Sequence, residues 1–201
     1  MGVEIRQVGA CFAGEVAGID LTEILSTENV KAIHDGMNKY AVLTCRKQPL
    51  TAEQQLAFSK QLGIIEHAID ATLREDKDAR LPSTFADVSN LDKEDRPFDI
   101  NDRPSLFAIG NRLWHSDSSF IVEPGKSNRW PVCSRFKTST AGFSQSCYAA
   151  KIVYLHDGQK GDLVMTDNQQ TMHKVRPFSV DEPRDMRRAT IVGDGPTVVK
   201  K

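Results

Sequence analysis

The stretch GDLVMTDNQQTMH, residues 161–173, runs from an apolar strand signal through a polar turn to His173. A second stretch, NRLWHSD at 111–117, places His115 two positions before Asp117. Residues two apart in a strand point to the same side, so His115 and Asp117 would present an imidazole and a carboxylate together. Each stretch alone is a weak signal, because H-x-D is a common triplet and a lone histidine usually packs in a core. Together they indicate strands whose ends carry polar side chains.

Helix signals come in the first third of the chain. Apolar residues recur at steps of three and four between positions 30 and 40, behind a cap at Ser26 or Thr27. Thr51 opens a second helix, and Gln54 stands three positions later, as a capping box requires. We therefore expect two amphipathic helices before residue 63.

Strand signals surround these helices and dominate the later part of the chain. They are short apolar runs at 41–45, 105–109, 152–156, 162–166 and 188–193. Early helices and late strands indicate a single domain of the α+β class with an antiparallel sheet. Between them, residues 66–104 are rich in charge and proline and lack a period, which is typical of a solvated loop or of a lid over an active site.

The charge balance and composition exclude several classes of protein. The 201 residues carry 26 basic and 27 acidic side chains, so a nucleic-acid partner is not expected. No run of about 18 apolar residues occurs, so we expect no membrane span. The N-terminus lacks the pattern of a secretory signal, and the four cysteines form no C-x-x-C pair. Reduced thiols and a cytoplasmic location follow as expectations.

Two arginines lie downstream of His173. Arg184 follows it by eleven positions, and Arg188 stands four further on. A basic cluster is usually a solvated face, but two arginines at a strand entry could instead bind carboxylates bidentately. Two histidines and a carboxylate can occupy one face of an octahedral metal, the facial triad of non-haem iron(II) oxygenases. The open positions would take a 2-oxo acid and dioxygen, and an arginine would hold the far carboxylate of the acid.

Six segments carry a resemblance to a known family. They are ACFAGEVAGIDL (10–21), YAVLTCRKQPLTAEQQLAFSKQLG (40–63), VSNLD (88–92), GNRLWHSDSSF (110–120), GDLVMTDNQQTMHKVRPF (161–178) and RDMRRATIVGD (184–194). In them the chain resembles the taurine dioxygenase / dichlorophenoxyacetate dioxygenase family of iron(II)- and 2-oxoglutarate-dependent enzymes, nearer the latter. The resemblance implies a double-stranded β-helix, or jelly roll, with flanking helices.

The resemblance also implies a reaction and a set of site residues. With Fe(II), 2-oxoglutarate and O2, the family hydroxylates or oxidatively cleaves a small substrate and releases succinate and CO2. Matched by motif, the iron ligands fall on His115, Asp117 and His173, the 2-oxoglutarate arginine on Arg184, an arginine for an anionic substrate on Arg188, and further substrate-pocket residues on Asn111 and His67. Related halogenases lack the carboxylate of Asp117, so hydroxylation is favoured.

Residues 121–150 depart from the family and replace a much longer region. His115 and His173 are only 58 positions apart in the sequence, too few for the strands that a jelly roll places between them. We therefore expect an incomplete jelly roll, which a second copy of the chain in a homo-oligomer could cover. A truncated relative without enzyme activity is the alternative, and a metal hydrolase with the same ligands is a third, weaker hypothesis.

Overall fold

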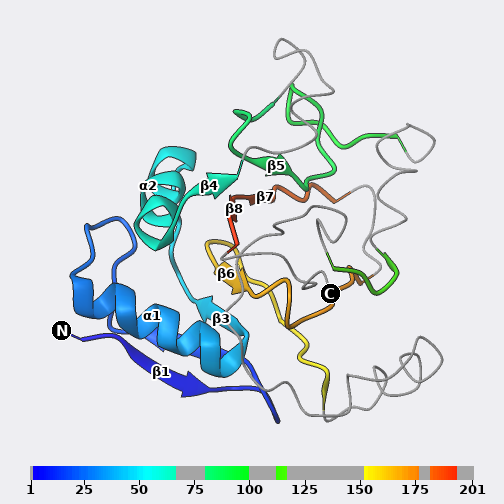
Figure 1. The fold of residues 1–201 in the computed structure, drawn as a ribbon. Helices are drawn as coiled ribbons and strands as arrows, with labels where there is room; N and C mark the ends of the chain where they lie inside the picture. Colours follow the sequence, from blue (N-terminus) through cyan, green and yellow to red (C-terminus); the bar gives the residue numbers. More distant parts are fainter. Residues whose placement is uncertain (1, 67–79, 100–111, 117–151, 177–181, 194–201) are drawn as a thin grey trace, which may run out of the picture. The chain divides into compact units, whose positions relative to one another are not determined.

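The computed structural model describes residues 2–66, 80–99, 112–116, 152–176 and 182–193 (Figure 1). The chain divides into two compact units. Unit 1 is formed by Met1–Leu62 with Lys126–Thr171, and unit 2 by Gly63–Gly125 with Met172–Lys201. Unit 1 holds both described helices and the larger sheet, whereas the predicted site residues all fall in unit 2.

A four-stranded sheet organises unit 1, in the order β1 (Glu4–Gln7), β2 (Gly14–Ala17), β3 (Val42–Cys45) and β6 (Leu163–Thr166). The β1–β2 and β3–β6 pairs are antiparallel, whereas β2 and β3 run parallel. Parallel neighbours need a long crossover, and α1 (Thr27–Tyr40) supplies it. The expectation of an antiparallel sheet is therefore wrong for the β2–β3 pair, because a helix separates the two strands in the sequence.

One face of α1 packs against this sheet, and Figure 1 shows the helix beside β1 and β3. Ile33 and Tyr40 are buried on that face, and Leu43 of β3 is fully buried beneath it. Gly36 permits the close approach, since a Cβ at this position would collide with the side chain of Ile5. Burial of each large apolar side chain stabilises the unit by roughly 1.5–3 kcal/mol.

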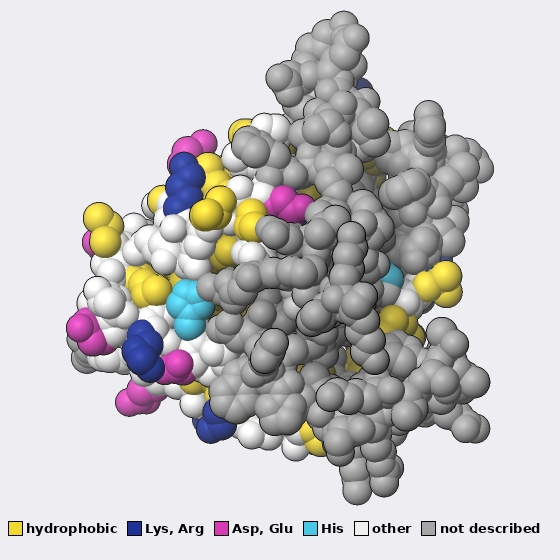
Figure 2. Space-filling model, in the orientation of Figure 1, with side chains coloured by type: hydrophobic (Ala, Val, Ile, Leu, Met, Phe, Trp, Pro, Cys, Tyr) yellow, Lys and Arg dark blue, Asp and Glu magenta, His cyan; other side chains and the backbone are white. Residues whose placement is uncertain are grey.

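Both helices begin at the caps that the sequence predicts. Ser26 accepts a hydrogen bond from the Asn29 amide at the start of α1. At α2 (Ala52–Leu62) the amides of Thr51 and Gln54 donate to each other's side chains, at 2.8 and 3.2 Å, which completes the capping box. On the face seen in Figure 2, acidic, basic and apolar side chains are interspersed over the part of the surface that these helices form. Within the described ranges, no helix is long and apolar enough to cross a membrane.

The described part of unit 2 contains two short antiparallel pairs and two isolated bridges. The pairs are β4 (Ile65–Glu66) with β8 (Thr190–Ile191), and β5 (Ala86–Asp87) with β7 (Arg187–Arg188). One isolated antiparallel bridge joins Leu91 to Pro97, and the other joins His115 to His173. The two strand pairs and the His115–His173 bridge therefore each tie an earlier segment of the chain to one nearer its C-terminal end.

Two predicted segments differ from expectation. Residues 152–156 form no strand, although all five are described. Side chains hold this segment instead, because Tyr154 packs edge-on against Phe12, with ring centroids 6.5 Å apart. Within 66–104, residues 80–99 contain β5 and bury Phe85 and Leu91, so this part is not a solvated loop.

The other strand predictions have mixed outcomes. The run at 41–45 contains β3, and the run at 162–166 contains β6. The run at 188–193 contains β8 and the second residue of β7, which begins one residue before the run. The run at 105–109 lies outside the described residues. Helices and short strands together agree with the α+β class for the part of the chain that is described.

Candidate active site

His115 and His173 form the centre of the candidate site in unit 2. Each donates its amide N–H to the carbonyl of the other, at 3.0 and 2.8 Å, as in a hydrogen-bonded antiparallel pair. Side chains of directly opposed residues project from the same face of such a pair. The two imidazole centroids lie 4.3 Å apart. The backbone thus brings together two nitrogen donors that are 58 positions apart in the sequence.

One hydrogen bond decides which nitrogen of His115 can bind a metal. Its Nδ1 lies 2.8 Å from the carbonyl oxygen of Leu113. A carbonyl only accepts hydrogen bonds, so Nδ1 carries the proton and the lone pair lies on Nε2. Metal-binding histidines usually show this arrangement, with the second nitrogen hydrogen-bonded to a carbonyl or a carboxylate. The chemistry of this donor therefore fits a divalent metal.

A cation–π contact flanks the histidine pair. The Lys174 ammonium lies 5.1 Å from the centroid of the Trp114 ring. Neighbours along an extended chain point to opposite sides, so this contact belongs to the face opposite the two imidazoles. Such a contact contributes about 0.5–1 kcal/mol at an exposed position. It stabilises the pairing of the two segments on the face opposite the imidazoles. Neither residue stands out in the sequence, because nothing local shows that the two segments pair.

Three predicted site residues, Asp117, Asn111 and His67, lie outside the described residues. Among the residues that are described, no group of three His, Cys, Asp or Glu side chains gathers to hold a metal. The structure therefore brings two of the three predicted ligands together, and the third lies two positions beyond His115 in the sequence.

Arg184 is held by residues 88–90 of the same unit. Its amide donates to Oδ1 of Asn90 at 2.7 Å, and its carbonyl accepts from the Asn90 amide at 3.2 Å. Its guanidinium Nη1 donates to the Val88 carbonyl at 3.3 Å. Burial lowers the pKa of this guanidinium, yet arginine stays protonated in proteins. A partly buried, fixed cation of this kind is suited to bind a carboxylate.

Arg188 is the second residue of β7 and lies opposite Ala86 of β5. Its positive charge acts on Glu66 of β4. Burial raises the pKa of the Glu66 carboxyl, and the charge of Arg188 offsets part of this rise. Glu66 is thus an ionisable neighbour of Arg188. The only sequence signal for it was its position next to His67.

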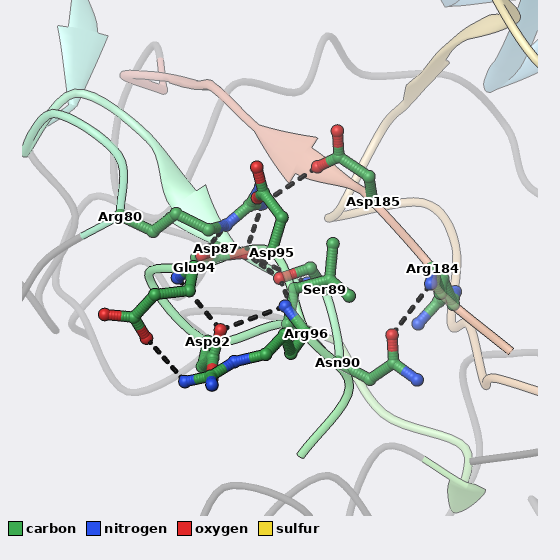
Figure 3. A network of polar contacts seen from close by, with 11 residues as sticks. Arg80, Asp87, Ser89, Asn90, Asp92, Glu94, Asp95, Arg96, Arg184 and Asp185 are labelled. Carbon is green, nitrogen blue, oxygen red and sulfur yellow. Dashed lines mark hydrogen bonds and ion pairs between the residues drawn. The ribbon is translucent and has the colours of Figure 1, made fainter. Parts of the chain in front are cut away.

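Arg80 forms ion pairs with Asp87, which precedes Val88, and with Asp185, which follows Arg184 (Figure 3). The Arg80 guanidinium binds both carboxylate oxygens of Asp87, at 2.9 and 3.1 Å, and one oxygen of Asp185 at 2.8 Å. The Arg80 side chain is only 13% exposed. The bidentate contact with the largely buried Asp87 fixes both partners more firmly than a surface ion pair does, whereas Asp185 is 61% exposed and makes a single contact.

The sequence profile of the family described as "Taurine catabolism dioxygenase TauD, TfdA family" matches residues 4–127 and 136–190. The chain belongs to this family. The predicted resemblance is confirmed, and so is the predicted class of enzyme, an α-ketoglutarate-dependent dioxygenase and hence an oxidoreductase, at the level of the TauD/TfdA family.

Three relatives show how far the similarity extends. The α-ketoglutarate-dependent 2,4-dichlorophenoxyacetate dioxygenase of Burkholderia sp. (strain RASC) is 24% identical, over 96% of this chain and 95% of the relative. The crystal structure of AAD-2 in complex with Mn(II) and N-oxalylglycine is 30% identical, with a TM-score of 0.83 over 98% of this chain and 100% of that one. A taurine dioxygenase from Burkholderia xenovorans shares the fold, with a TM-score of 0.64 at 17% identity, over 98% of this chain and 93% of that one.

This TauD/TfdA chain is much shorter than its Burkholderia relative. The alignment with the 2,4-dichlorophenoxyacetate dioxygenase needs 289 positions for a chain of 201 residues, so at least 88 positions hold residues of the relative alone. The match to the family profile is interrupted at residues 128–135.

Proposed function

We propose that this chain is an Fe(II)- and 2-oxoglutarate-dependent dioxygenase. It would hydroxylate or oxidatively cleave a small carboxylate-bearing substrate, with release of succinate and CO2. The observation that carries the proposal is the backbone-paired His115 and His173, with imidazoles 4.3 Å apart, in a chain of the TauD/TfdA family.

His115, Asp117 and His173 would hold the iron. The Nε2 lone pair of His115 is one donor, and the His173 imidazole beside it is the second. Asp117, two positions after His115, would face the same side if the chain continues extended. Fe(II) held there would supply the activation of dioxygen that drives oxidative decarboxylation of the 2-oxo acid. The related AAD-2 structure is a complex with Mn(II) and N-oxalylglycine, which supports a metal and a 2-oxoglutarate analogue in such a site.

The two arginines would bind the two carboxylates of the reaction. Arg184 would pair with the distal carboxylate of 2-oxoglutarate, because its guanidinium is partly buried and fixed by the Val88 carbonyl. Arg188 would bind the substrate anion, together with Asn111 and His67. The name of the Burkholderia relative, a 2,4-dichlorophenoxyacetate dioxygenase, supports an aryloxyacetate as a candidate substrate.

For the fold, we propose a jelly roll that is incomplete in its middle. The similarity to AAD-2 supports the jelly roll, and the break in the family match at 128–135 supports a shortened region within 121–150. A second copy of the chain would cover the shortened side, and residues 66–104 would close over the site. The competing proposal is an inactive relative that binds metal without turnover, which the at least 88 missing positions favour.

The test is iron-dependent release of succinate from 2-oxoglutarate, measured with and without 2,4-dichlorophenoxyacetate. We expect turnover by the wild type and at least a hundredfold loss in Asp117→Ala and His173→Ala. His34→Ala, on α1 in unit 1, is the control and should retain turnover. A folded, iron-loaded wild type that releases no succinate would establish the inactive relative instead. Full turnover in Asp117→Ala would remove that carboxylate from the ligand set.

A further inference from the structure

The hydrogen bonds of Asn90 converge on the segment that carries Arg184 (Figure 3). Its side-chain Oδ1 accepts from the Arg184 amide at 2.7 Å, and its Nδ2 donates to the Glu182 carbonyl at 2.9 Å. Its own amide donates to the Arg184 carbonyl at 3.2 Å, and its carbonyl accepts from the Phe98 amide at 2.9 Å. One residue therefore fixes the backbone on both sides of Arg184.

We propose that Asn90 is a positioning residue for Arg184, and that it holds the guanidinium where the distal carboxylate of 2-oxoglutarate binds. This inference rests on the proposed role of Arg184. Asn90 itself touches neither the cosubstrate nor the metal in this proposal.

The two contacts of the Asn90 side chain explain why an asparagine stands here. The Arg184 amide needs an acceptor and the Glu182 carbonyl needs a donor, and a carboxamide supplies both from one planar group. Aspartate would keep the acceptor and lose the donor. Serine is shorter by one atom and would not span the distance to either partner.

The position of the Arg184 backbone matters because its side chain is tethered as well. Val88 accepts from the Arg184 guanidinium at 3.3 Å, and the Val88 amide donates to the Met186 carbonyl at 3.0 Å. Residues 88–90 thus hold Arg184 by both its main chain and its side chain. A bidentate arginine–carboxylate pair depends on the alignment of two parallel hydrogen bonds, so a small shift of the backbone weakens both.

The experiment measures binding rather than turnover. Wild type and Asn90→Ala are loaded with Mn(II) and titrated with 2-oxoglutarate by calorimetry. Pyruvate is the second ligand, because it keeps the 2-oxo acid head and lacks the distal carboxylate. We expect Asn90→Ala to weaken 2-oxoglutarate binding at least tenfold, and to leave the dissociation constants of pyruvate and of Mn(II) within about twofold of wild type.

A matched control and a rescue separate positioning from general loss of stability. Asn29→Ala removes a comparable contact, the acceptor of the Val3 amide in unit 1, and should leave 2-oxoglutarate binding unchanged. Asn90→Asp keeps the acceptor for the Arg184 amide and should bind 2-oxoglutarate more tightly than Asn90→Ala. If the alanine variant does not fold, Asn90→Ser replaces it, with the same tenfold loss expected.

Arg184→Ala, alone and combined with Asn90→Ala, distinguishes the inference from the function on which it rests. We expect the double variant to bind 2-oxoglutarate no more weakly than Arg184→Ala, because Asn90 acts through that side chain. If Arg184→Ala weakens binding and Asn90→Ala does not, the inference is overturned and the role of Arg184 stands. If neither variant weakens binding, the role of Arg184 falls as well. An equal loss for pyruvate in Asn90→Ala would also overturn the inference.

Discussion

Single main-chain carbonyls accept hydrogen bonds from the side chains of two residues of the candidate site. The Leu113 carbonyl fixes the tautomer of His115, and the Val88 carbonyl orients the guanidinium of Arg184. Both acceptors belong to the backbone, so substitution of the side chains at 113 and 88 would leave these contacts possible. The residues that can be tested directly are therefore the donors.

The two arginines are expected to act on different ligands. Lysine cannot reproduce the bidentate hydrogen bonds of arginine, so Arg184→Lys should raise the KM for 2-oxoglutarate about tenfold and change the KM for substrate less than twofold. Arg188→Lys should do the reverse. Steady-state kinetics with each ligand varied in turn measures both constants. Arg187→Lys, the neighbouring residue of β7, is the control and should change neither. A shift of the same constant by both variants would contradict the assignment.

At the scale of elements, the capping box makes a local contribution to stability. Thr51→Ala removes the acceptor for the Gln54 amide at the start of α2, and we expect the free energy of unfolding to fall by about 1 kcal/mol. Urea unfolding followed by circular dichroism measures the change. Thr27→Ala, at the first residue of α1, is the control, because Ser26 provides the cap there. Equal losses of unfolding free energy in the two variants would show that the capping box contributes no more to stability than the Thr27 side chain does.

The contact between Arg80 and Asp87 should make stability depend on pH. Burial raises the pKa of the Asp87 carboxyl, but the hydrogen bonds from Arg80 and Ser89 outweigh it and hold this pKa below its usual value. A carboxyl with a lowered folded pKa stabilises the protein above its unfolded pKa of about 3.9, and this contribution is lost as the pH falls further. We therefore expect Arg80→Gln to flatten the fall in the free energy of unfolding between pH 5 and pH 3.

The comparison for this prediction is Arg96→Gln. Arg96 pairs with Asp92 and Glu94, but its side chain is 70% exposed, so its loss should change the pH dependence much less. Urea unfolding at pH 5, 4 and 3 gives the slope of the free energy of unfolding against pH for the wild type, Arg80→Gln and Arg96→Gln. A slope for Arg80→Gln equal to that of the wild type would show that Asp87 does not carry this dependence.

Local signals predicted some elements, and non-local pairing decided the others. The caps at Ser26 and Thr51 and the buried run that became β3 follow from neighbouring residues alone. The parallel β2–β3 pair, the Arg80 ion pairs and the Trp114–Lys174 contact each join residues distant in the sequence. At 152–156 the apolar run predicted a strand, but no strand formed, because strand propensity depends on a partner and on packing.

The site shows the same division. The motifs predicted that His115 and His173 bind one metal; the described backbone brings the two residues together, and their binding of a metal stays a prediction. Asn90 and Glu66 had no such motif, because each matters only through its contact with an arginine near the C-terminal end. A sequence alone carries no signal for such contacts.

At the scale of the whole molecule, ligand binding should raise the melting temperature. Stability matters for this chain because β6 is an edge strand of the described sheet, with Val164 on it 40% exposed. The backbone of an edge strand can pair with another chain and so promote aggregation. Ligands that bind only the folded state, at a hundred times their dissociation constant, add about 2.7 kcal/mol. For a chain of this length we expect a rise of roughly 5–10 °C with Mn(II) and 2-oxoglutarate.

His173→Ala is the control for this measurement by scanning calorimetry. Without one metal ligand the same additions should raise the melting temperature by much less. An equal rise in the variant would indicate that Mn(II) stabilises the protein elsewhere, and would remove the link between the histidine pair and stability.

The mutual hydrogen bonds of His115 and His173 have a consequence for how this family can change in length. The two residues pair through their own main chains, so the contact is made by the two ends of the 58-position interval and not by the residues within it. Doubling a flexible loop costs only about 0.6 kcal/mol in closure entropy. The Burkholderia relative fills at least 88 alignment positions that this chain does not, so length varies widely within the family. Because β6 lies within the interval and pairs with β3, any change in its length has to leave that strand intact.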